Sequence, residues 1–315
     1  MSAATGLGLL DLAILEACEY AGAVAFTPFQ MTARVLDVLF GRTGVGPRTA
    51  HEPLCDMVRP WVSHLRLIEF HGNYGSLDFG PANPRYTECR LTPLGQAALA
   101  AERGEVGPLP IGLINGNTHV DGIRPPLDPR RVLQALRSAS AATDAELAAI
   151  VGLPAFPTGC QVTGDLDTFS AGGLADLTLT ARLTWGVDAV VVSNLAPDAT
   201  PSQIATAIAA RVQTSHLDSE PDRSWQSPES LAAVPLIREV IDEAHGDVVR
   251  LVVRLTKGAD RTVVRRFLEE IWGIRRTMTV ALGRPIADLT RSVAEAFPSD
   301  LTERLVVLEQ GFQAP

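Results

Sequence analysis

Lysine is almost absent from this chain, because Lys257 is the only one among 315 residues. Acidic residues outnumber basic ones by 36 to 27, which gives a formal net charge of −9. A surface with this balance repels polyanions, so the composition excludes a protein that binds nucleic acid over its whole surface. Any phosphate-binding site has to be a local patch formed by arginine, whose planar fork suits phosphate oxygens.

Paired cysteine motifs and long apolar runs are missing as well. The four cysteines stand far apart in apolar or helical contexts, at Cys18, Cys55, Cys89 and Cys160. No CxxC spacing indicates a zinc site or a redox pair, so we expect buried thiols and no metal site. The first twenty residues lack a basic segment, and no apolar run reaches the roughly 18 residues that span a bilayer. These absences favour a cytoplasmic protein without a membrane partner.

The first hundred residues carry signals for helices and then for strands. Apolar spacing predicts a helix from Leu7 to Tyr20. Thr27-Pro28-Phe29-Gln30 combines a cap, a first-turn proline and a glutamine that can close a capping box, so a second helix is predicted to begin after Thr27. A second capping box, Thr49 with Glu52, predicts a third helix. The remaining predicted elements are strand 65–70, a glycine turn at 72–75, an extended segment 85–91 and a helix that begins at Thr92-Pro93.

A Gly- and Pro-rich passage from Gly104 to Gly112 marks a boundary, after which strands and capped helices alternate. With 46% hydrophobic residues, the chain can bury a substantial core, and its length suggests two domains. The pattern indicates a mixed α+β architecture. Predicted helices begin at Asp128, Thr143 and Thr200 and cover about 264–271 and 286–297, and predicted strands cover 177–184, 187–193 and 248–256.

The most specific stretch is His71 to Arg90, HGNYGSLDFGPANPRYTECR, in which a glycine-framed turn precedes Arg85-Tyr86-Thr87-Glu88. This combination resembles the A subunit of bacterial type IIA DNA topoisomerases, the gyrase and topoisomerase IV family. Further similarities follow in the same order along the chain. They are TARVLDVLFG at 32–41, Asn115-Gly116, Arg124-Pro125-Pro126, LPAFPT at 153–158, and Asp242, Glu243, Gly246 and Arg250.

The resemblance implies a winged-helix (CAP-like) DNA-gate domain at residues 1–108, a mixed α/β tower domain at 109–297 and a tail at 298–315. It implies that Tyr86 is the nucleophile that cuts DNA, becoming a 5′-phosphotyrosine, and that Arg85 assists it. It also implies a homodimer on double-stranded DNA, near the nucleoid, that works as an isomerase with a gyrase or topoisomerase IV B-type subunit. Mg²⁺ and ATP would be bound by that partner and not by this chain.

Four further residues are predicted to contact DNA. His71 abuts the glycine turn, Asn73 belongs to it, and Arg48 ends the stretch that replaces a histidine-containing segment of the family. Val120 stands where the family has an intercalating isoleucine, although loop packing is an alternative role for it.

Several departures from the family favour an alternative function. Where the family's first helix carries basic residues facing DNA, this chain has Gly8, Asp11, Leu12 and Ala13, and the two histidines of the cleavage site are absent from 43–48. Of the cleavage residues, only Arg85 and Tyr86 carry over. The alternative is a catalytically degenerate paralogue that binds DNA or regulates a topoisomerase; a winged-helix regulator with an effector-binding second domain is a third interpretation.

Two local alternatives also follow from the residues alone. The ring of Tyr86 could pack under the turn while Arg85 pairs with Glu88. The arginines from Arg261 to Arg276 form either a solvated helix face or a phosphate-tracking patch.

Overall fold

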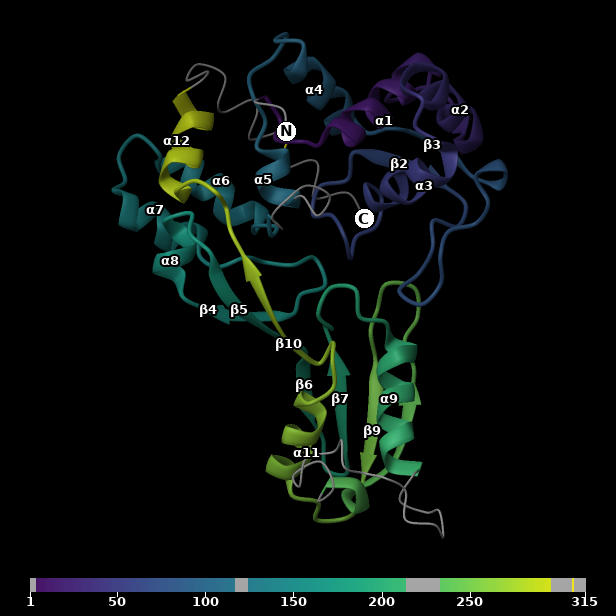
Figure 1. Ribbon diagram of the computed structural model, residues 1–315, viewed down its shortest axis with the longest axis vertical. Coiled ribbons are helices and arrows are strands. Elements are labelled where there is room, and N and C mark those ends of the chain that lie inside the picture. Colours follow the sequence, from purple (N-terminus) through teal and green to yellow (C-terminus); the bar gives the residue numbers. More distant parts are fainter. Residues whose placement is uncertain (1–3, 117–123, 214–232, 296–307, 309–315) are drawn as a thin grey trace.

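The computed structural model describes residues 4–116, 124–213, 233–295 and 308. Helices and strands alternate along these ranges, which confirms the mixed α+β class. The described strands form antiparallel sheets of three, three and four strands. Figure 1 shows a broad part that contains the N-terminal helices and a narrow extension that projects from it. In the described ranges, no helix is long and apolar enough to cross a membrane.

The N-terminal hundred residues pack helices against a small sheet. The elements are α1 (Leu9–Tyr20), β1 (Gln30–Met31), α2 (Thr32–Thr43), α3 (Pro47–Asp56), β2 (Ile68–His71), β3 (Glu88–Leu91) and α4 (Pro93–Glu102). Strand β3 is central, since the sheet order is β1-β3-β2. The apolar stripe of α1 is buried as its spacing predicts, with Ile14, Leu15 and Cys18 at 0% exposure. Because β3 begins two residues after Tyr86, the central strand fixes the position of that tyrosine.

The predicted start of the second helix after Thr27 is wrong. Helix α2 begins at Thr32, because Gln30 and Met31 pair with β3 instead. The Thr27 hydroxyl donates to the carbonyl oxygen of Val24 at 2.8 Å and so closes a turn ahead of the strand. A local capping signal is therefore overridden by strand pairing with a distant segment.

The capping box predicted at Thr49 is also wrong. Helix α3 begins at Pro47, after Gly46, so Thr49 lies inside the helix. Proline is favoured at the first helical position because its fixed φ suits the helix and its missing N–H is not needed there. The caps at Thr92 and Thr200 are confirmed: the Thr92 hydroxyl accepts from the amide of Gly95 at 2.9 Å, and that of Thr200 accepts from Gln203 at 3.3 Å.

The middle of the chain and its C-terminal helix form a second helical group beside another sheet. Its elements are α5 (Ile111–Asn115), α6 (Pro129–Ser138), α7 (Asp144–Val151), β4 (Gln161–Gly164), α8 (Leu166–Ser170), β5 (Ala175–Thr180), β10 (Arg275–Val280) and α12 (Ile286–Glu295). Helix α12 packs on α6 and α7 although more than a hundred residues separate them. The predicted caps are present, since Asp128 accepts from two amides of α6 and Thr143 forms a capping box with Glu146.

The narrow extension contains a four-stranded sheet with helices beside it. We call it the distal unit, meaning residues 181–213 and 233–274. Its elements are β6 (Arg182–Trp185), β7 (Ala189–Ser193), α9 (Pro201–Gln213), the 3-10 turn Val234–Leu236, β8 (Ile237–Asp242), β9 (Leu251–Leu255) and α11 (Arg261–Glu269), with strand order β6-β7-β9-β8.

The single strand predicted over 177–184 is divided in the structure. Residues before Ala181 belong to β5, and residues after it belong to β6 in a different sheet. The amide of Ala181 donates to the carbonyl oxygen of Ile274 at 2.7 Å, so the strand leaves one sheet and enters the next at this residue. The alternating pattern continues across the junction, which is why the sequence shows no break there.

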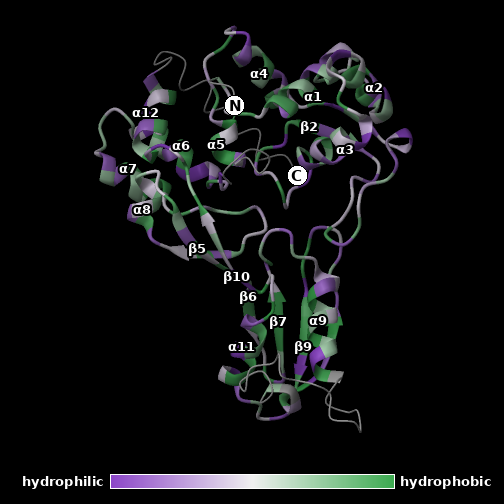
Figure 2. Cartoon of the chain, in the orientation of Figure 1, coloured by the Kyte–Doolittle hydropathy of each residue, from purple (hydrophilic) through white to green (hydrophobic). Residues whose placement is uncertain are grey.

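Two hydrophobic clusters follow from this arrangement. The larger one joins the N-terminal helices to the middle of the chain and to α12, and the smaller one lies in the distal unit between the sheet and α9 and α11. Hydrophobic residues follow the strands and inner helix faces of the distal unit (Figure 2). The larger cluster contains residues on both sides of position 108, and the division of the chain there stays a prediction. All four cysteines are buried free thiols, as expected.

Candidate active site around Tyr86

Tyr86 ends a 3-10 turn, Pro84–Tyr86, that directly precedes β3. Asn83 closes the turn, because its side-chain oxygen accepts from the amide of Arg85 at 3.1 Å and its carbonyl oxygen accepts from the amide of Tyr86 at 2.9 Å. Pro84 holds the first position of the turn, where no amide donor is required. The prediction that the extended segment begins at Arg85 is therefore wrong, because Arg85 and Tyr86 lie in the turn.

The side chain of Tyr86 lies in solvent, with 81% of the residue exposed. Arg85 is exposed too, and it forms no ion pair within the described part of the chain. Glu88 instead faces His71, with 3.7 Å between its Oε2 and Nδ1 of the histidine. The alternative of a packed tyrosine ring with an Arg85–Glu88 pair is thus wrong. The phenol and the guanidinium are both available to a ligand.

The backbone behind Tyr86 is firmly held, in contrast to its side chain. Thr87 is 1% exposed, its carbonyl oxygen accepts from the amide of Thr32 at 2.9 Å, and the two threonine hydroxyls hydrogen-bond at 3.0 Å. A Cβ on Gly72, which has φ +102°, would meet the carbonyl oxygen of Tyr86 at 3.3 Å. The turn therefore sits between Gly72 and the first residue of α2, whose N-terminal end favours negative charge.

His71 ends β2, and Asn73 lies in the loop that leads from β2 to the turn of Tyr86. His71 stacks on Phe29, with ring centroids 3.6 Å apart and planes at 20°. The Asn73 side chain accepts from the amide of Gly75 at 2.7 Å, while its carbonyl oxygen accepts from Ala82 at 2.9 Å and closes the loop. Both side chains are exposed, so either can contact a ligand that lies over the turn.

Two other predicted contacts are not brought to the turn. Arg48 is exposed in the first turn of α3, and no contact between it and the Tyr86 turn occurs among the described residues. Val120 lies outside the described residues. Asn115, just before that segment, exchanges two hydrogen bonds with the backbone of Leu65, at 2.8 and 2.9 Å. Asn115 is thus anchored to the N-terminal region.

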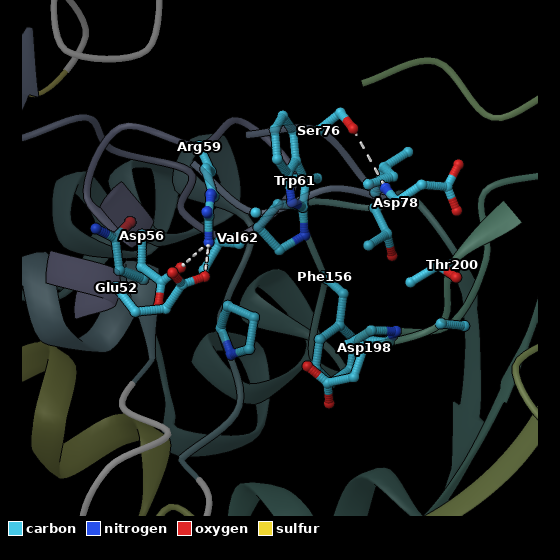
Figure 3. A pocket seen from close by; sticks show the side chains of 18 of the residues that line it. Glu52, Asp56, Arg59, Trp61, Val62, Ser76, Asp78, Phe156, Asp198 and Thr200 are labelled. Atoms are coloured by element: carbon cyan, nitrogen blue, oxygen red, sulfur yellow. Dashed lines mark hydrogen bonds and ion pairs between the residues drawn. The ribbon is translucent and has the colours of Figure 1, made fainter. Parts of the chain in front are cut away.

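Sequence reasoning missed a cavity of about 590 Å³ between the N-terminal region and the distal unit. Figure 3 shows Glu52, Asp56 and Arg59 on one side of it and Asp78, Asp198 and Thr200 on the other. Aromatic side chains, among them Trp61 and Phe156, line the space between the charged groups.

Arg59 is the central residue of the near wall. Its guanidinium pairs with Asp56 at 3.0 Å and with Glu52 at 2.5 Å, and its Nε donates to the carbonyl oxygen of Tyr74 at 3.0 Å. Burial alone would lower the pKa of Arg59, but the hydrogen bond with Glu52 and the two carboxylate charges outweigh burial and raise it. The spacing of Glu52, Asp56 and Arg59 along α3 and the turn after it was the available sequence signal, since these positions share one side of the helix.

Within the described residues, no group of three or more His, Cys, Asp or Glu side chains could hold a metal ion. The functional groups of the candidate site are the phenol of Tyr86, the guanidinium of Arg85 and the imidazole of His71. Such a set can bind a phosphodiester and present a nucleophile to it.

Comparison with known proteins agrees with this description. No protein-family model matches the chain. It is 27% identical to the A subunit of the chloroplastic/mitochondrial DNA gyrase of Arabidopsis thaliana over 297 residues, covering 82% of this chain and 29% of that protein. It is 27% identical over 304 residues to the A subunit of the DNA gyrase of Synechocystis, covering 82% and 33%.

A third relative is the A subunit of DNA topoisomerase 4 of Synechocystis, at 30% identity over 198 residues, which covers 53% of this chain and 22% of that protein. The chain spans at most about a third of the length of these relatives. The similarity to several A subunits extends over most of the chain. These similarities support a diverged protein that resembles the A subunits of type IIA topoisomerases.

Proposed function

We propose that this chain binds duplex DNA and cleaves and rejoins it through a 5′-phosphotyrosyl intermediate on Tyr86. The observation that carries the proposal is the exposed phenol beside the exposed Arg85, on a turn whose backbone is fixed by Thr87 and Gly72. A buried or mobile tyrosine could not be aligned with a scissile phosphate, whereas a rigid turn with a free side chain can.

The chemistry follows from the residue types. The phenol oxygen attacks phosphorus, loses its proton to a base or to solvent, and forms a bond to the 5′-phosphate while the 3′-oxygen leaves and takes up a proton. Because a free phenol has a pKa of about 10, a nearby positive charge assists the attack. Arg85 supplies that charge and also stabilises the charge on the phosphate oxygens in the transition state. The reverse reaction rejoins the strand.

We interpret α1–α3 with the β1-β3-β2 sheet as the winged-helix DNA-gate domain, and the later part of the chain as a tower-like domain. The order of three helices, strand, glycine turn and strand supports this interpretation. Two copies would bring two tyrosines to one duplex, one for each strand. His71 and Asn73 lie in the exposed turn, where they can contact the DNA backbone.

Mg²⁺ and ATP belong, in this proposal, to a B-type partner subunit. The basis is the family resemblance and the names of the relatives, which are subunits of gyrase and topoisomerase IV. A divalent ion supplied by such a partner would neutralise charge on the reacting phosphate. The residues of this chain would hold the DNA and present the phenol.

Covalent trapping tests the proposal. The purified chain is mixed with a gyrase B-type subunit, end-labelled duplex DNA and Mg²⁺, and the mixture is quenched with detergent. We expect labelled DNA attached to the wild type and to Tyr20→Phe, a control at another exposed tyrosine, but not to Tyr86→Phe. Arg85→Ala should reduce the rate of attachment by roughly 10²-fold.

Two outcomes would contradict the cleavage proposal. Attachment that persists in Tyr86→Phe would assign the nucleophile elsewhere. DNA binding by the wild type without any attachment would support the alternative, a degenerate paralogue that binds DNA or regulates a topoisomerase.

A further inference from the structure

Two hydrogen bonds connect the loop before Tyr86 to the distal unit, and the longer one runs from the amide of Leu77 to the carbonyl oxygen of Gly246 at 3.5 Å. The Asp78 carboxylate accepts from the amide of Ser202 at 2.9 Å, across 124 positions of sequence. Ser202 is the second residue of α9, so Asp78 satisfies one of the free amides at the start of that helix. Thr200 satisfies the next amide at 3.3 Å. Helix α9 thus has a cap of its own and a second cap supplied by the Tyr86 loop.

The loop that carries Asp78 is held together by its own hydrogen bonds. The Ser76 hydroxyl accepts from the amides of Asp78 and Phe79 at 3.3 and 3.2 Å, and the Ser76 amide donates to the carbonyl oxygen of Phe79 at 2.8 Å. The bond between Ala82 and Asn73 closes the loop just before the turn of Tyr86. These hydrogen bonds restrict the segment between Asp78 and the turn of Tyr86, so a displacement of Asp78 is expected to displace the turn as well.

The same loop is attached to the N-terminal region on its other side. Arg59 donates to the carbonyl oxygen of Tyr74, and a Cβ on Gly75 would come within 2.9 Å of its guanidinium. Figure 3 shows Arg59 and Asp78 among the side chains that line the cavity. The loop therefore bridges the N-terminal region and the distal unit.

We propose that Asp78 is a positioning residue that makes the placement of the Tyr86 turn depend on the position of α9. Its carboxylate accepts from the amide of Ser202 and lies at the positive end of the dipole of that helix. Movement of the distal unit away from the loop breaks this contact and releases the turn, while Arg59 keeps the loop attached to the N-terminal region. The catalytic consequence rests on the function proposed for Tyr86, but the mechanical coupling does not.

Hydrogen exchange tests the coupling without DNA. In Asp78→Ala, exchange should rise roughly fivefold both at the start of α9 and in the loop 76–82, because the cap joins the two. Asp78→Asn should stay within about twofold of wild type, since asparagine caps as well as aspartate. Asp260→Ala is the matched control: Asp260 caps α11 in the same unit through Thr262 at 2.8 Å, so only α11 should exchange faster. Faster exchange in α9 with an unchanged loop would overturn the coupling.

Covalent trapping then tests the consequence for Tyr86. Asp78→Ala should slow DNA attachment about tenfold while DNA affinity stays within about twofold, and Asp78→Asn should restore the rate. Equal losses of affinity and rate in Asp78→Ala and Asp260→Ala would indicate general destabilisation and overturn the positioning role. If the wild type forms no covalent complex but the exchange pattern holds, the proposed cleavage function fails and the coupling stands.

Discussion

Thr87 and Thr32 hydrogen-bond through their hydroxyl groups at 3.0 Å inside the protein, directly behind the exposed Tyr86. They are 1% and 0% exposed. Thr32 is the first residue of α2, and Thr87 joins the Tyr86 turn to the central strand β3. The exposed side chain of Tyr86 is thus followed by that of Thr87, which cannot move without breaking a buried hydrogen bond.

Removing one of these hydroxyls should destabilise the fold. Thr87→Val or Thr32→Val keeps the branched shape but leaves the other hydroxyl buried with one partner fewer, which costs about 1–3 kcal/mol. The double variant should lose less free energy of unfolding than the two single variants together. Both hydroxyls are then absent, so no buried hydroxyl is left without its threonine partner. Urea unfolding measures all three. Tyr86→Phe is the control and should stay within about 0.5 kcal/mol of wild type, since its ring is exposed.

Arg59→Ala should lower the free energy of unfolding by about 3 kcal/mol, because it removes the ion pair with Asp56 and the hydrogen bond to the Tyr74 carbonyl oxygen. Arg59→Lys should recover only part of this loss, since one ammonium cannot replace the planar fork. Glu52→Gln should cost less than about 1 kcal/mol, as the Glu52 side chain is 57% exposed. Thermal unfolding separates the three, and a neutral effect of Arg59→Ala would contradict the role given to this residue.

The fold could be predicted from the sequence where its signals are local. The helix starts after Asp128 and Thr143 are predicted correctly because the capping side chain and the amides it binds lie within three residues. The same reasoning fails at Thr27, where pairing of Gln30 with Cys89 in β3 decides the structure. A contact between segments about sixty residues apart leaves no trace in local propensity.

The candidate site divides in the same way. The family resemblance of adjacent residues made Arg85 and Tyr86 candidates, and their role stays a prediction. The Asp78 contact with Ser202 and the cavity beside Arg59 could not be predicted, since both depend on how the distal unit lies against the loop. Neither the sequence of the loop around Asp78 nor that of the start of α9 indicates that the two segments meet.

Acid should destabilise the protein through His64. Burial lowers the pKa of His64 below its ordinary value, although the carbonyl oxygen of Ala155, 2.7 Å from Nε2, partly opposes the shift. The unfolded chain therefore binds this proton more readily than the folded one. The stabilisation of the folded state by neutral His64 is complete above the unfolded pKa of about 6.5. It declines as the pH falls, by at most about 1.4 kcal/mol per pH unit.

His64→Gln can still donate to Ala155 but does not titrate. Its free energy of unfolding should fall less than that of wild type between about pH 6.5 and 5, the window below the ordinary histidine pKa. Urea unfolding at a series of pH values measures both curves. Parallel curves would show that His64 is not the responsible group and would direct attention to His51, whose pKa burial also lowers.

Two glycines in helices should respond to alanine with opposite signs. A Cβ on Gly95, in the first turn of α4, would lie 2.1 Å from the carbonyl oxygen of Leu67, so the helix has to move away from the strand region it packs on. Gly95→Ala should therefore destabilise the protein by about 1–3 kcal/mol. Gly41 lies exposed in α2 with nothing within 4 Å of its Cβ position. Gly41→Ala should stabilise the protein by about 0.5–1 kcal/mol, because alanine loses less backbone entropy in a helix. Urea unfolding of the two variants tests the packing of α4 against Leu67, and a stabilising Gly95→Ala would show that this close approach does not exist in solution.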